Sequence, residues 1–293
     1  MEQQRAKGMI PHTGRPFIKM HGLGNDFVIF DGRADAFTPS ADFARAVADR
    51  HTGVGCDEVI TMEMDGNADL FMRIHNPDGS EAGACGNATR CVAALALDET
   101  GNDRLTIRTL SGVLKAWRGE DGQITVDMGA PRLDWRDIPL AREMDSLDVD
   151  FAVTTPDGRT LRAPVAVNMG NPHAVFFVDD AEAVDLAAIG PGVEHDPLFP
   201  ERVNVSVAEV RGRDAIRVRV WERGAGITLA CGSAACANVV AATRRGLIDG
   251  RARVMMDGGA LDMEWRADGH VLMTGPVATV FTGVWPEFED ASS

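Results

Sequence analysis

The sequence predicts an α+β protein made of two pseudo-symmetric halves, each a strand-rich, barrel-like sheet around one central helix. Two observations predict this fold. Short segments in which apolar and polar residues alternate, typical of strands, outnumber helical segments. A Cys-Gly motif with its surroundings also occurs twice, which indicates an internal duplication. We expect the active site in the cleft between the halves.

Seven segments have the composition and alternation of strands, and three have the pattern of helices. The strand segments are 27–30, 70–74, 104–110, 123–128, 174–178, 215–221 and 270–274. Turns are predicted at the Asp-Gly pairs 121–122, 157–158 and 268–269. The helical segments are 39–50 with Ser40 as N-cap, 87–99, and 233–246 ending at Gly246.

Five features of the chain recur in the same order at a nearly constant distance. The segment 84–88 (ACGNA) matches 230–234 (ACGSA), which lies 146 residues further on. The other four are a Gly-Asn pair before a strand, a strand with a central Arg, a single Gly after a strand, and an Asp-Gly turn. One short match would mean little, but five in order predict two related domains, residues 1–132 and 133–277.

Composition excludes several classes of function. The 293 residues suffice for two domains, and a net charge of −15 argues against nucleic acid and against anionic membranes as partners. No apolar run reaches the ~18 residues of a membrane helix, and no secretory signal precedes the first strand. The five cysteines include no Cys-x-x-Cys pair, so we expect free thiols, no metal site and a cytoplasmic protein.

Cys85 and Cys231, the cysteines of the repeated motif, each stand directly before an Ala-rich helix. A helix N-terminus offers free N–H groups and partial positive charge, which can hold a carboxylate and favour a thiolate. We therefore expect a lowered pKa for both thiols. A free cysteine can equally be a small buried apolar residue, and we assign that role to Cys56, Cys91 and Cys236.

The residues that follow the two cysteines suit a ligand site. Gly86 and Gly232 allow the backbone to come close to a ligand, and Asn87 and Ser233 are suitable helix caps. Two thiols on opposite sides of one ligand atom fit inversion at the α-carbon of an amino acid, in which a thiolate removes a proton and a thiol donates one. Such sulfurs would lie about 7 Å apart, and converging N–H groups would stabilise the developing charge without a cofactor.

Six longer motifs occur in order along the chain: KMHGLGNDFVIFD (19–31), HTGVGCDEVI (51–60), RIHNPDGSEAGACGNATRC (73–91), NMGNPHAVFFV (168–178), RVNVSV (202–207) and VWERGAGITLACGSAACA (220–237). With these motifs the chain resembles the diaminopimelate epimerase family of cofactor-independent amino-acid racemases over nearly all of residues 17–285. This resemblance implies epimerisation of L,L-diaminopimelate to meso-diaminopimelate in lysine and peptidoglycan precursor synthesis, with no cofactor. It also implies a homodimer, and a final segment, 278–293, that packs back on the first half.

The resemblance also implies a role for individual residues. Cys85 and Cys231 correspond to the two acid–base residues, and His173 and Glu222 to residues that tune the thiols. The residues implied to contact the substrate are Asn25, Glu58, Asn76, Gly86, Asn87, Asn171, Asn204, Glu222, Arg223, Gly232 and Ser233. Glu58 stands where the family often has Gln. Phe281 stands where the family often has an aromatic residue near a dimer contact.

Three other functions fit parts of this pattern. One is another two-cysteine racemase, of the proline or hydroxyproline type, but the Asn, Arg and Glu residues beyond the reacting centre argue against a cyclic substrate. A second is a cysteine hydrolase that uses Cys85 with His173, which would not need the second cysteine. A third is an amino-acid-binding protein without catalysis, which would need neither thiol.

Overall fold

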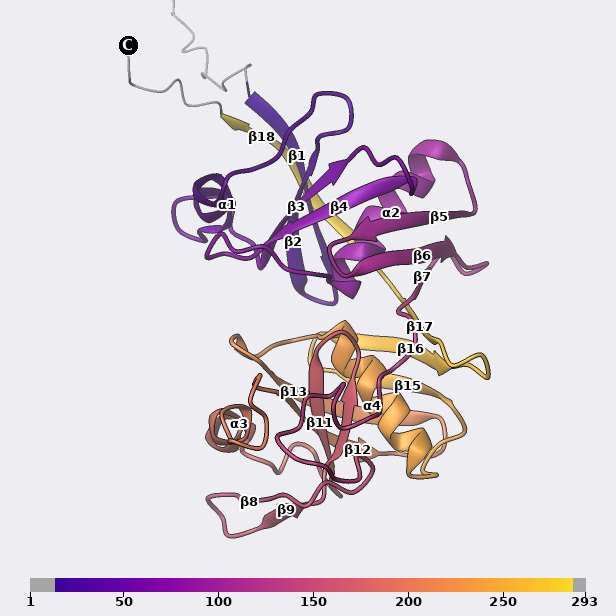
Figure 1. The fold of residues 1–293 in the computed structure, drawn as a ribbon. Coiled ribbons are helices and arrows are strands. Elements are labelled where there is room, and N and C mark those ends of the chain that lie inside the picture. The colour runs from indigo at the N-terminus through magenta and orange to yellow at the C-terminus, as the bar shows by residue number, and fades with distance from the viewer. Residues whose placement is uncertain (1–13, 287–293) are drawn as a thin grey trace, which may run out of the picture.

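The computed structural model describes residues 14–286, which form two lobes, each with strands around one long helix (Figure 1). The first lobe contains β1 (Gly14–Gly22), β2 (Asn25–Asp31), α1 (Ala41–Ala48), β3 (Glu58–Glu63), β4 (Leu70–His75), α2 (Gly86–Thr100), β5 (Arg104–Thr109), β6 (Gly112–Arg118), β7 (Ile124–Asp127) and β18 (Ala278–Pro286). The predicted fold class is confirmed. Within residues 14–286, no helix has the length and apolar character needed to span a membrane.

The second lobe repeats this order of elements. It contains β8 (Ala152–Thr154), β9 (Thr160–Arg162), β10 (Val165–Asn168), β11 (Pro172–Phe177), α3 (Leu186–Glu194), β12 (Asn204–Val210), β13 (Ala215–Glu222), β14 (Gly226–Ile227), α4 (Gly232–Arg244), β15 (Arg251–Met256), β16 (Gly259–Trp265) and β17 (Val271–Gly275). The strands run β18-β1-β2-β3-β4-β5-β6-β7 in one lobe and β10-β11-β12-β13-β15-β16-β17 in the other. Antiparallel pairing of β7 with β17 joins the two sheets.

Strand pairing follows the repeat distance found in the sequence. In the first lobe Thr61 of β3 pairs with Arg73 of β4, and in the second Val207 of β12 pairs with Arg219 of β13. Both members of the second pair lie 146 residues after those of the first. The parallel pairs β2–β3 and β11–β12 repeat in the same way. The strands that carry most of the predicted site therefore have one register in both lobes.

The chain crosses between the lobes twice. After β7, Arg132 forms an isolated antiparallel bridge with Asn168 at the end of β10. After β17, the chain returns and β18 pairs with β1 along its whole length. Residues 278–286 thus lie on the first lobe, whereas 287–293 are outside the described residues. A domain boundary between residues 132 and 133 stays a prediction.

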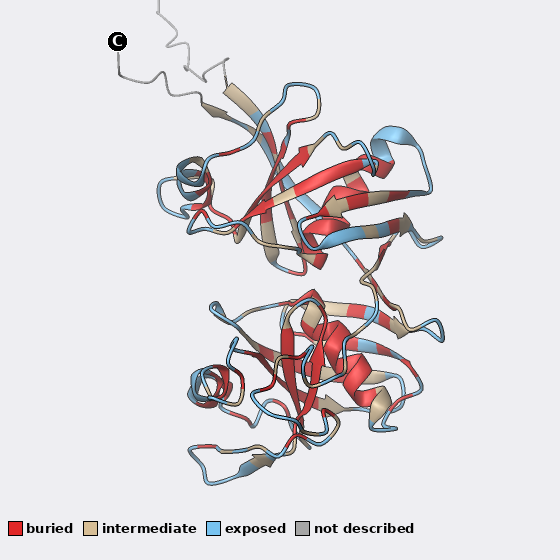
Figure 2. Ribbon diagram, viewed as in Figure 1, coloured by how far each residue is buried: buried red, intermediate tan, exposed pale blue. Residues whose placement is uncertain are grey.

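The two Ala-rich helices are enclosed by their sheets. Helix α2 contacts β1, β2, β5, β6 and β7, and α4 contacts strands from β10 to β17. Almost every residue of α2 up to Leu97 is buried, as are Ala234–Ala242 of α4 (Figure 2). A helix that is apolar on all sides requires such enclosure, and small Ala side chains let the strands pack close to it. With this packing, each helix begins at the side of its lobe that faces the other lobe.

The structure has four helices in its described part, whereas the sequence predicts three. The additional helix, α3, contains Pro191 between two glycines, residues that strongly disfavour a helix interior and conceal it in the sequence. Asp185 caps it by accepting a hydrogen bond from the Ala188 N–H at 3.1 Å. Helix α3 lies at the repeat distance from α1, so the duplication contained the signal for it.

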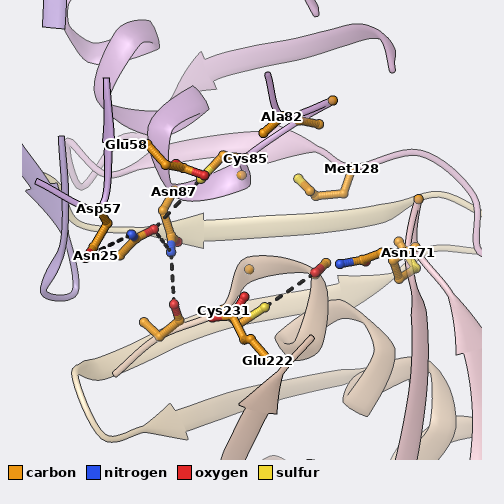
Figure 3. A pocket seen from close by; sticks show the side chains of 18 of the residues that line it. Asn25, Asp57, Glu58, Ala82, Cys85, Asn87, Met128, Asn171, Glu222 and Cys231 are labelled. Atoms are coloured by element: carbon orange, nitrogen blue, oxygen red, sulfur yellow. Dashed lines mark hydrogen bonds between the residues drawn. The ribbon is translucent and has the colours of Figure 1, made fainter. Parts of the chain in front are cut away.

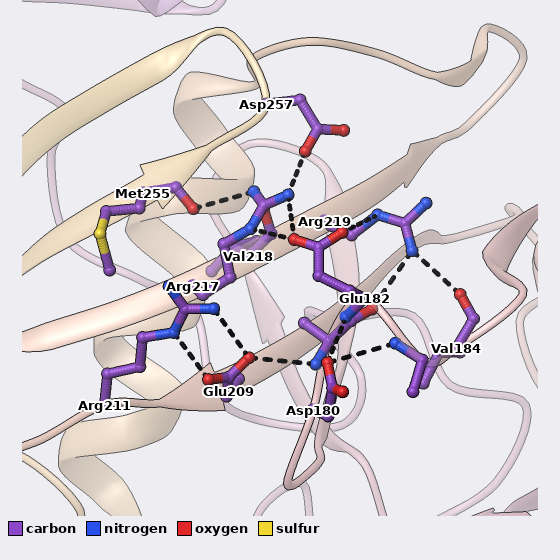
Figure 4. A network of polar contacts seen from close by, with 12 residues as sticks. Asp180, Glu182, Val184, Glu209, Arg211, Arg217, Val218, Arg219, Met255 and Asp257 are labelled. Atoms are coloured by element: carbon purple, nitrogen blue, oxygen red, sulfur yellow. Dashed lines mark hydrogen bonds and ion pairs between the residues drawn. The ribbon is translucent and has the colours of Figure 1, made fainter.

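Charged side chains hold the segment between β11 and α3 (Figure 4). Arg219 donates hydrogen bonds to the carbonyl groups of Ala181 (3.2 Å) and Val184 (3.0 Å). Arg217 forms an ion pair with Glu182 at 2.7 Å. The two hydrogen bonds of Arg219 satisfy backbone carbonyls that belong to no strand or helix. The repeated Arg of β13 therefore has a structural role.

Gly258, between β15 and β16, is a point where the second lobe touches the first. A Cβ added there would collide with the carbonyl oxygen of Leu23. We predict that Gly258→Ala destabilises the protein by about 1–3 kcal/mol, the usual cost of overpacking, and lowers the thermal midpoint by several degrees in calorimetry. Gly66→Ala is the control, because no atom lies within 4 Å of its added Cβ. Equal midpoints for the two variants would contradict the prediction.

Candidate active site

A cavity of about 1390 Å³ lies between the lobes and is lined by residues of both (Figure 3). Cys85 and Cys231 enter it from opposite lobes. Every residue expected to contact the substrate lines this cavity: Asn25, Glu58, Asn76, Gly86, Asn87, Asn171, Asn204, Glu222, Arg223, Gly232 and Ser233. His173 is not among its lining residues. Within residues 14–286, no group of three or more His, Cys, Asp or Glu residues is arranged to hold a metal ion.

Each cavity cysteine is the N-cap of its helix. Cys85 precedes α2 and Cys231 precedes α4, both with extended backbone (φ −144° and −131°). The expectation that Asn87 and Ser233 act as caps is wrong, since they are the second helical residues. The first N–H groups of each helix, which have no acceptor inside the helix, belong to cavity-lining residues. Two helix N-termini therefore present N–H groups and partial positive charge to one cavity.

The expected lowering of the thiol pKa does not occur in this structure. Burial raises the pKa of both thiols well above the ordinary value, and a neighbouring carboxylate raises it further. The carboxylate is Glu58 for Cys85 and Glu222 for Cys231. Hydrogen bonds from the N–H groups of Ala88 and Ala234 lower the pKa by a smaller amount. The helix N-termini alone therefore do not convert these thiols to thiolates.

The side chain of Asn25 is held in one orientation beside Cys85. Its Nδ2 donates to Asp57 Oδ2 at 3.0 Å. Its Oδ1 consequently faces the other way, where it accepts from Asn87 Nδ2 at 3.0 Å and lies 3.8 Å from Cys85 Sγ. The amide of Asn25 thus links Asp57, which also lines the cavity, to the thiol.

Asp57 is a functional candidate that the sequence reasoning did not single out. Arg50 forms ion pairs of 2.7 Å with both Asp57 and Asp26, and Lys19 also pairs with Asp26. Burial raises the pKa of Asp26, but Arg50 and Lys19 outweigh it and bring the value to about 2. Asp57 directly precedes Glu58 within the 51–60 motif, so the motif contained a signal for it.

In the second lobe, backbone groups orient Asn204. Its Oδ1 accepts from the Arg223 N–H at 2.9 Å, and its Nδ2 donates to the Pro172 carbonyl at 3.0 Å. Asn204 is buried, so these bonds satisfy groups that water cannot reach. They also hold the end of β13 against the start of β12.

His173 lies behind Asn171. Its Nε2 is 2.8 Å from Asn171 Oδ1, and the ring is fully buried. Burial and the charge of Arg223 lower the pKa of His173 to about 3, so the ring is neutral and can donate its proton to Asn171. The hydrogen bond of His173 is thus to an amide that lines the cavity, and its tuning of a thiol stays a prediction.

Three further polar groups line the cavity. The Glu222 carboxylate accepts a hydrogen bond from the Thr228 hydroxyl, and burial raises the pKa of Glu222. Arg223 Nη1 donates to the Glu201 carbonyl at 2.8 Å. Asn76 Nδ2 donates to Ser80 Oγ at 3.0 Å. The cavity thus contains a cation, a carboxylate and an amide, a set that can bind a second amino-acid group.

The two helix starts pack on one methionine. Met273, in β17 at the joint between the sheets, is fully buried. A Cβ at Gly86 would lie 2.7 Å from Met273 Cε, and one at Gly232 would lie 3.0 Å from its Sδ. Asn87 Nδ2 also lies 3.4 Å from the Ala230 carbonyl in the other lobe. Glycine is therefore needed at both positions to let the helix starts approach this side chain.

The repeat relates the site residues in pairs. The pairs are Asn25 and Asn171, Glu58 and Asn204, Asn76 and Glu222, Cys85 and Cys231, Gly86 and Gly232, and Asn87 and Ser233. Two of these pairs combine a carboxylate with an amide. The carboxylate is on β3 in the first lobe and at the end of β13 in the second, so the site is only approximately symmetric.

Comparison with known proteins agrees with this geometry. The family model for diaminopimelate epimerase matches residues 17–133 and 165–280. The diaminopimelate epimerase of Rhodospirillum centenum is 59% identical over 272 residues, 92% of this chain and 91% of that protein. The diaminopimelate epimerase of Acidiphilium cryptum is 56% identical over 271 residues, 92% of this chain and 96% of that protein.

Solved structures with low sequence identity share the fold. A predicted epimerase from Pseudomonas aeruginosa superimposes with a TM-score of 0.66 at 20% identity, covering 94% of this chain and 100% of that one. A hydroxyproline epimerase from Agrobacterium vitis gives 0.64 at 16% identity, covering 92% and 91%. With the family match in both lobes and relatives that are more than half identical, the chain belongs to the diaminopimelate epimerase family.

Proposed function

We propose that this protein converts L,L-diaminopimelate to meso-diaminopimelate, with Cys85 and Cys231 as the two acid–base groups. The observation that carries the proposal is that both thiols line one cavity, each at the start of an equivalent buried helix from a different lobe. Relatives 59% and 56% identical bear the name diaminopimelate epimerase, which supports the choice of substrate.

The reaction inverts one α-carbon. One cysteine, as thiolate, removes the α-proton, and the other, as thiol, delivers a proton to the opposite face, so no atom is gained or lost overall. The α-carboxylate binds the N–H groups at the starts of α2 and α4, Gly86–Asn87 and Gly232–Ser233. These donors stabilise the charge that develops when the α-proton leaves. The scheme uses no cofactor.

The distal amino-acid group selects the substrate. Arg223 binds the distal carboxylate through paired hydrogen bonds, and Glu222 pairs with the ammonium group. Asn25, Asn76, Asn171 and Asn204 each donate and accept hydrogen bonds, as a zwitterionic ligand requires. Proline and hydroxyproline are cyclic and have no second amino-acid group to bind these residues.

We also propose a cytoplasmic homodimer that supplies lysine and peptidoglycan precursor synthesis. Strand β18 is at the edge of the sheet, and its side chains Val280, Phe281 and Val284 are 54%, 46% and 44% exposed. An apolar edge strand is a surface prone to pair with another chain. Phe281 packs edge-on against Phe17, with ring centroids 6.0 Å apart, so the strand is held in place for such a contact.

Exchange of the α-proton tests the chemistry. L,L-diaminopimelate incubated with the reduced protein in deuterium oxide, without pyridoxal phosphate, should gain deuterium at an α-carbon while meso product forms. L-proline and hydroxyproline should not exchange under the same conditions. Mass spectrometry and chiral chromatography measure both results. Absence of exchange with diaminopimelate would refute the proposed activity.

Cys85→Ala and Cys231→Ala test the two-thiol scheme. Each should lower epimerisation by about 10²–10⁴-fold, the usual contribution of a positioned acid or base. Cys91→Ala is the matched control, because Cys91 lies in α2 and is fully buried away from the cavity. If either cavity variant kept normal turnover, the assignment of that cysteine would be wrong.

Asp57→Asn tests the orientation of Asn25. An amide at position 57 no longer holds Asn25 Nδ2 as firmly, so Asn25 Oδ1 loses its fixed place beside Cys85. We expect kcat/KM to fall about 10- to 150-fold, which corresponds to the loss of one charged hydrogen bond of about 1.5–3 kcal/mol. Asp65→Asn is the control, since Asp65 pairs with Arg108 away from the cavity. Equal effects of the two variants would contradict a specific role for Asp57.

Light scattering tests the dimer. Phe281→Glu places a charge on the exposed face of β18 and should convert the dimer to a monomer at micromolar concentration. Leu110→Glu is the control, because Leu110 is also apolar and 56% exposed but lies between β5 and β6. A Phe281→Glu protein that remains dimeric would place the interface elsewhere.

A further inference from the structure

The Glu58 carboxyl lies beside the Cys85 thiol, a position that substrate binding alone does not require. We propose that Glu58 is the acid–base partner of Cys85: its carboxylate accepts the thiol proton and so forms the thiolate that attacks the substrate. The inference rests on the proposed function, in which Cys85 is one of two acid–base groups. Three observations support it. Glu58 lies beside the thiol, it has no ion pair within residues 14–286, and the second lobe has an equivalent carboxylate beside its own thiol.

The side chain of Glu58 stands beside the Cys85 thiol. Glu58 begins β3, and its carboxyl group lies next to Cys85 at the cavity wall (Figure 3). Burial raises the pKa of the thiol, and the charge of the neighbouring Glu58 carboxylate raises it further. The hydrogen bond of Cys85 Sγ in the structure is to Asn25 Oδ1, at 3.8 Å. One oxygen of the Glu58 carboxyl, Oε2, is buried and has no hydrogen-bond partner within residues 14–286.

Within residues 14–286, no ion pair involves the Glu58 carboxylate. The cations Arg50 and Lys19, which line the same cavity, pair with Asp26 and Asp57. A buried carboxylate without a cation binds a proton readily, since the charged form has lost its hydration. Glu58 is therefore suited to accept a proton from the adjacent thiol.

The second lobe has the same chemical pair in a different arrangement. Besides burial, the charge of Glu222 raises the pKa of Cys231 there, although Glu222 corresponds through the repeat to Asn76 and not to Glu58. The residue that corresponds to Glu58 is Asn204. Each lobe thus places one carboxylate against its thiol, from a different strand. A carboxylate can take up a proton and an amide cannot, so the two thiols have equivalent partners.

The protonation of Glu58 agrees with this role. Burial raises the pKa of Glu58 to about 7, although the interaction with Cys85 lowers this pKa. Glu222 from β13 and Asp57 from the preceding position add small increases, and with Cys85 they are the titratable groups that act on Glu58. Asn25 on β2 is uncharged. The Glu58–Cys85 pair therefore loses one proton near neutral pH, and the two groups share the one that remains.

The proton balance of the step is complete. The S–H bond of Cys85 breaks and an O–H bond forms on Glu58. The thiolate then takes the α-proton and becomes a thiol again, while Cys231 gives its proton to the opposite face of the carbon. Glu58 ends protonated and Cys231 ends as thiolate. One proton passing from Glu58 to Cys231 through solvent restores the starting state.

The pH dependence of Cys85 alkylation tests the proposal without substrate. Iodoacetamide reacts with the thiolate, and mass spectrometry quantifies each cysteine separately. If the pair shares a proton, the rate at Cys85 in the native protein rises with pH up to about 7 and is then level to about pH 9. In Glu58→Gln the plateau disappears, and the rate continues to rise about tenfold per pH unit. Cys231 in the same molecules should change less than twofold, and Glu120→Gln, an exposed charge control, should match the native protein.

Two results would overturn the proposal. One is a native Cys85 rate that rises tenfold per pH unit between pH 7 and 9, which can be seen even if the variant does not fold. The other is the same profile in the native protein and in Glu58→Gln. The alkylation assay contains no diaminopimelate, so it tests the Glu58–Cys85 pair separately from the proposed activity. A protein that shows the plateau but does not epimerise diaminopimelate would refute the activity and leave the pair intact.

Discussion

The antiparallel pairing of β7 with β17 is the constraint on which the active site depends. It joins two curved sheets edge to edge, so that each buried helix begins at the joint and not at an outer surface. Met273 of β17 lies between the two helix starts, and Gly86 and Gly232 leave room for it. The two cysteines and the first N–H groups of both helices consequently face one cavity. Because its own sheet encloses each helix, the thiol and the N–H groups at the helix start can face only this cavity.

The same enclosure sets the electrostatics of the site. Helix N-termini favour thiolates, yet the burial that aligns them raises the pKa of Cys85 and Cys231 well above the ordinary value. Removal of water acts on every charged form and here outweighs the partial charge of a helix end. The carboxylates beside the thiols add to this effect while they are charged. Formation of a thiolate therefore requires a group inside the cavity that can take the proton.

The two halves share one backbone frame but differ at single side chains. Strands β3 and β4 repeat in β12 and β13 with one register, so corresponding side chains reach corresponding places. The two halves differ at positions that would bind the distal end of the substrate. Arg223, which binds a distal carboxylate in the proposed scheme, corresponds to Pro77 in the first half. The cations Lys19 and Arg50 are likewise confined to the first lobe, where they support Asp26 and Asp57. A nearly symmetric fold thus presents an asymmetric set of polar groups.

The sequence by itself determined the fold class, the duplication and the cysteine pair, because apolar alternation and repeated motifs can be read from the order of residues. Its resemblance to a known family indicated eleven further residues that line the cavity. Helix α3 was missed since Pro191 and its flanking glycines conceal a segment that only packing makes helical. The tertiary structure alone decided the protonation of the thiols, the contact of Glu58 with Cys85, the position of His173 behind Asn171 and the support of Asn25 by Asp57. Each of these depends on burial or on contacts between residues far apart in the chain, and neither quantity is contained in the spacing of residues along it.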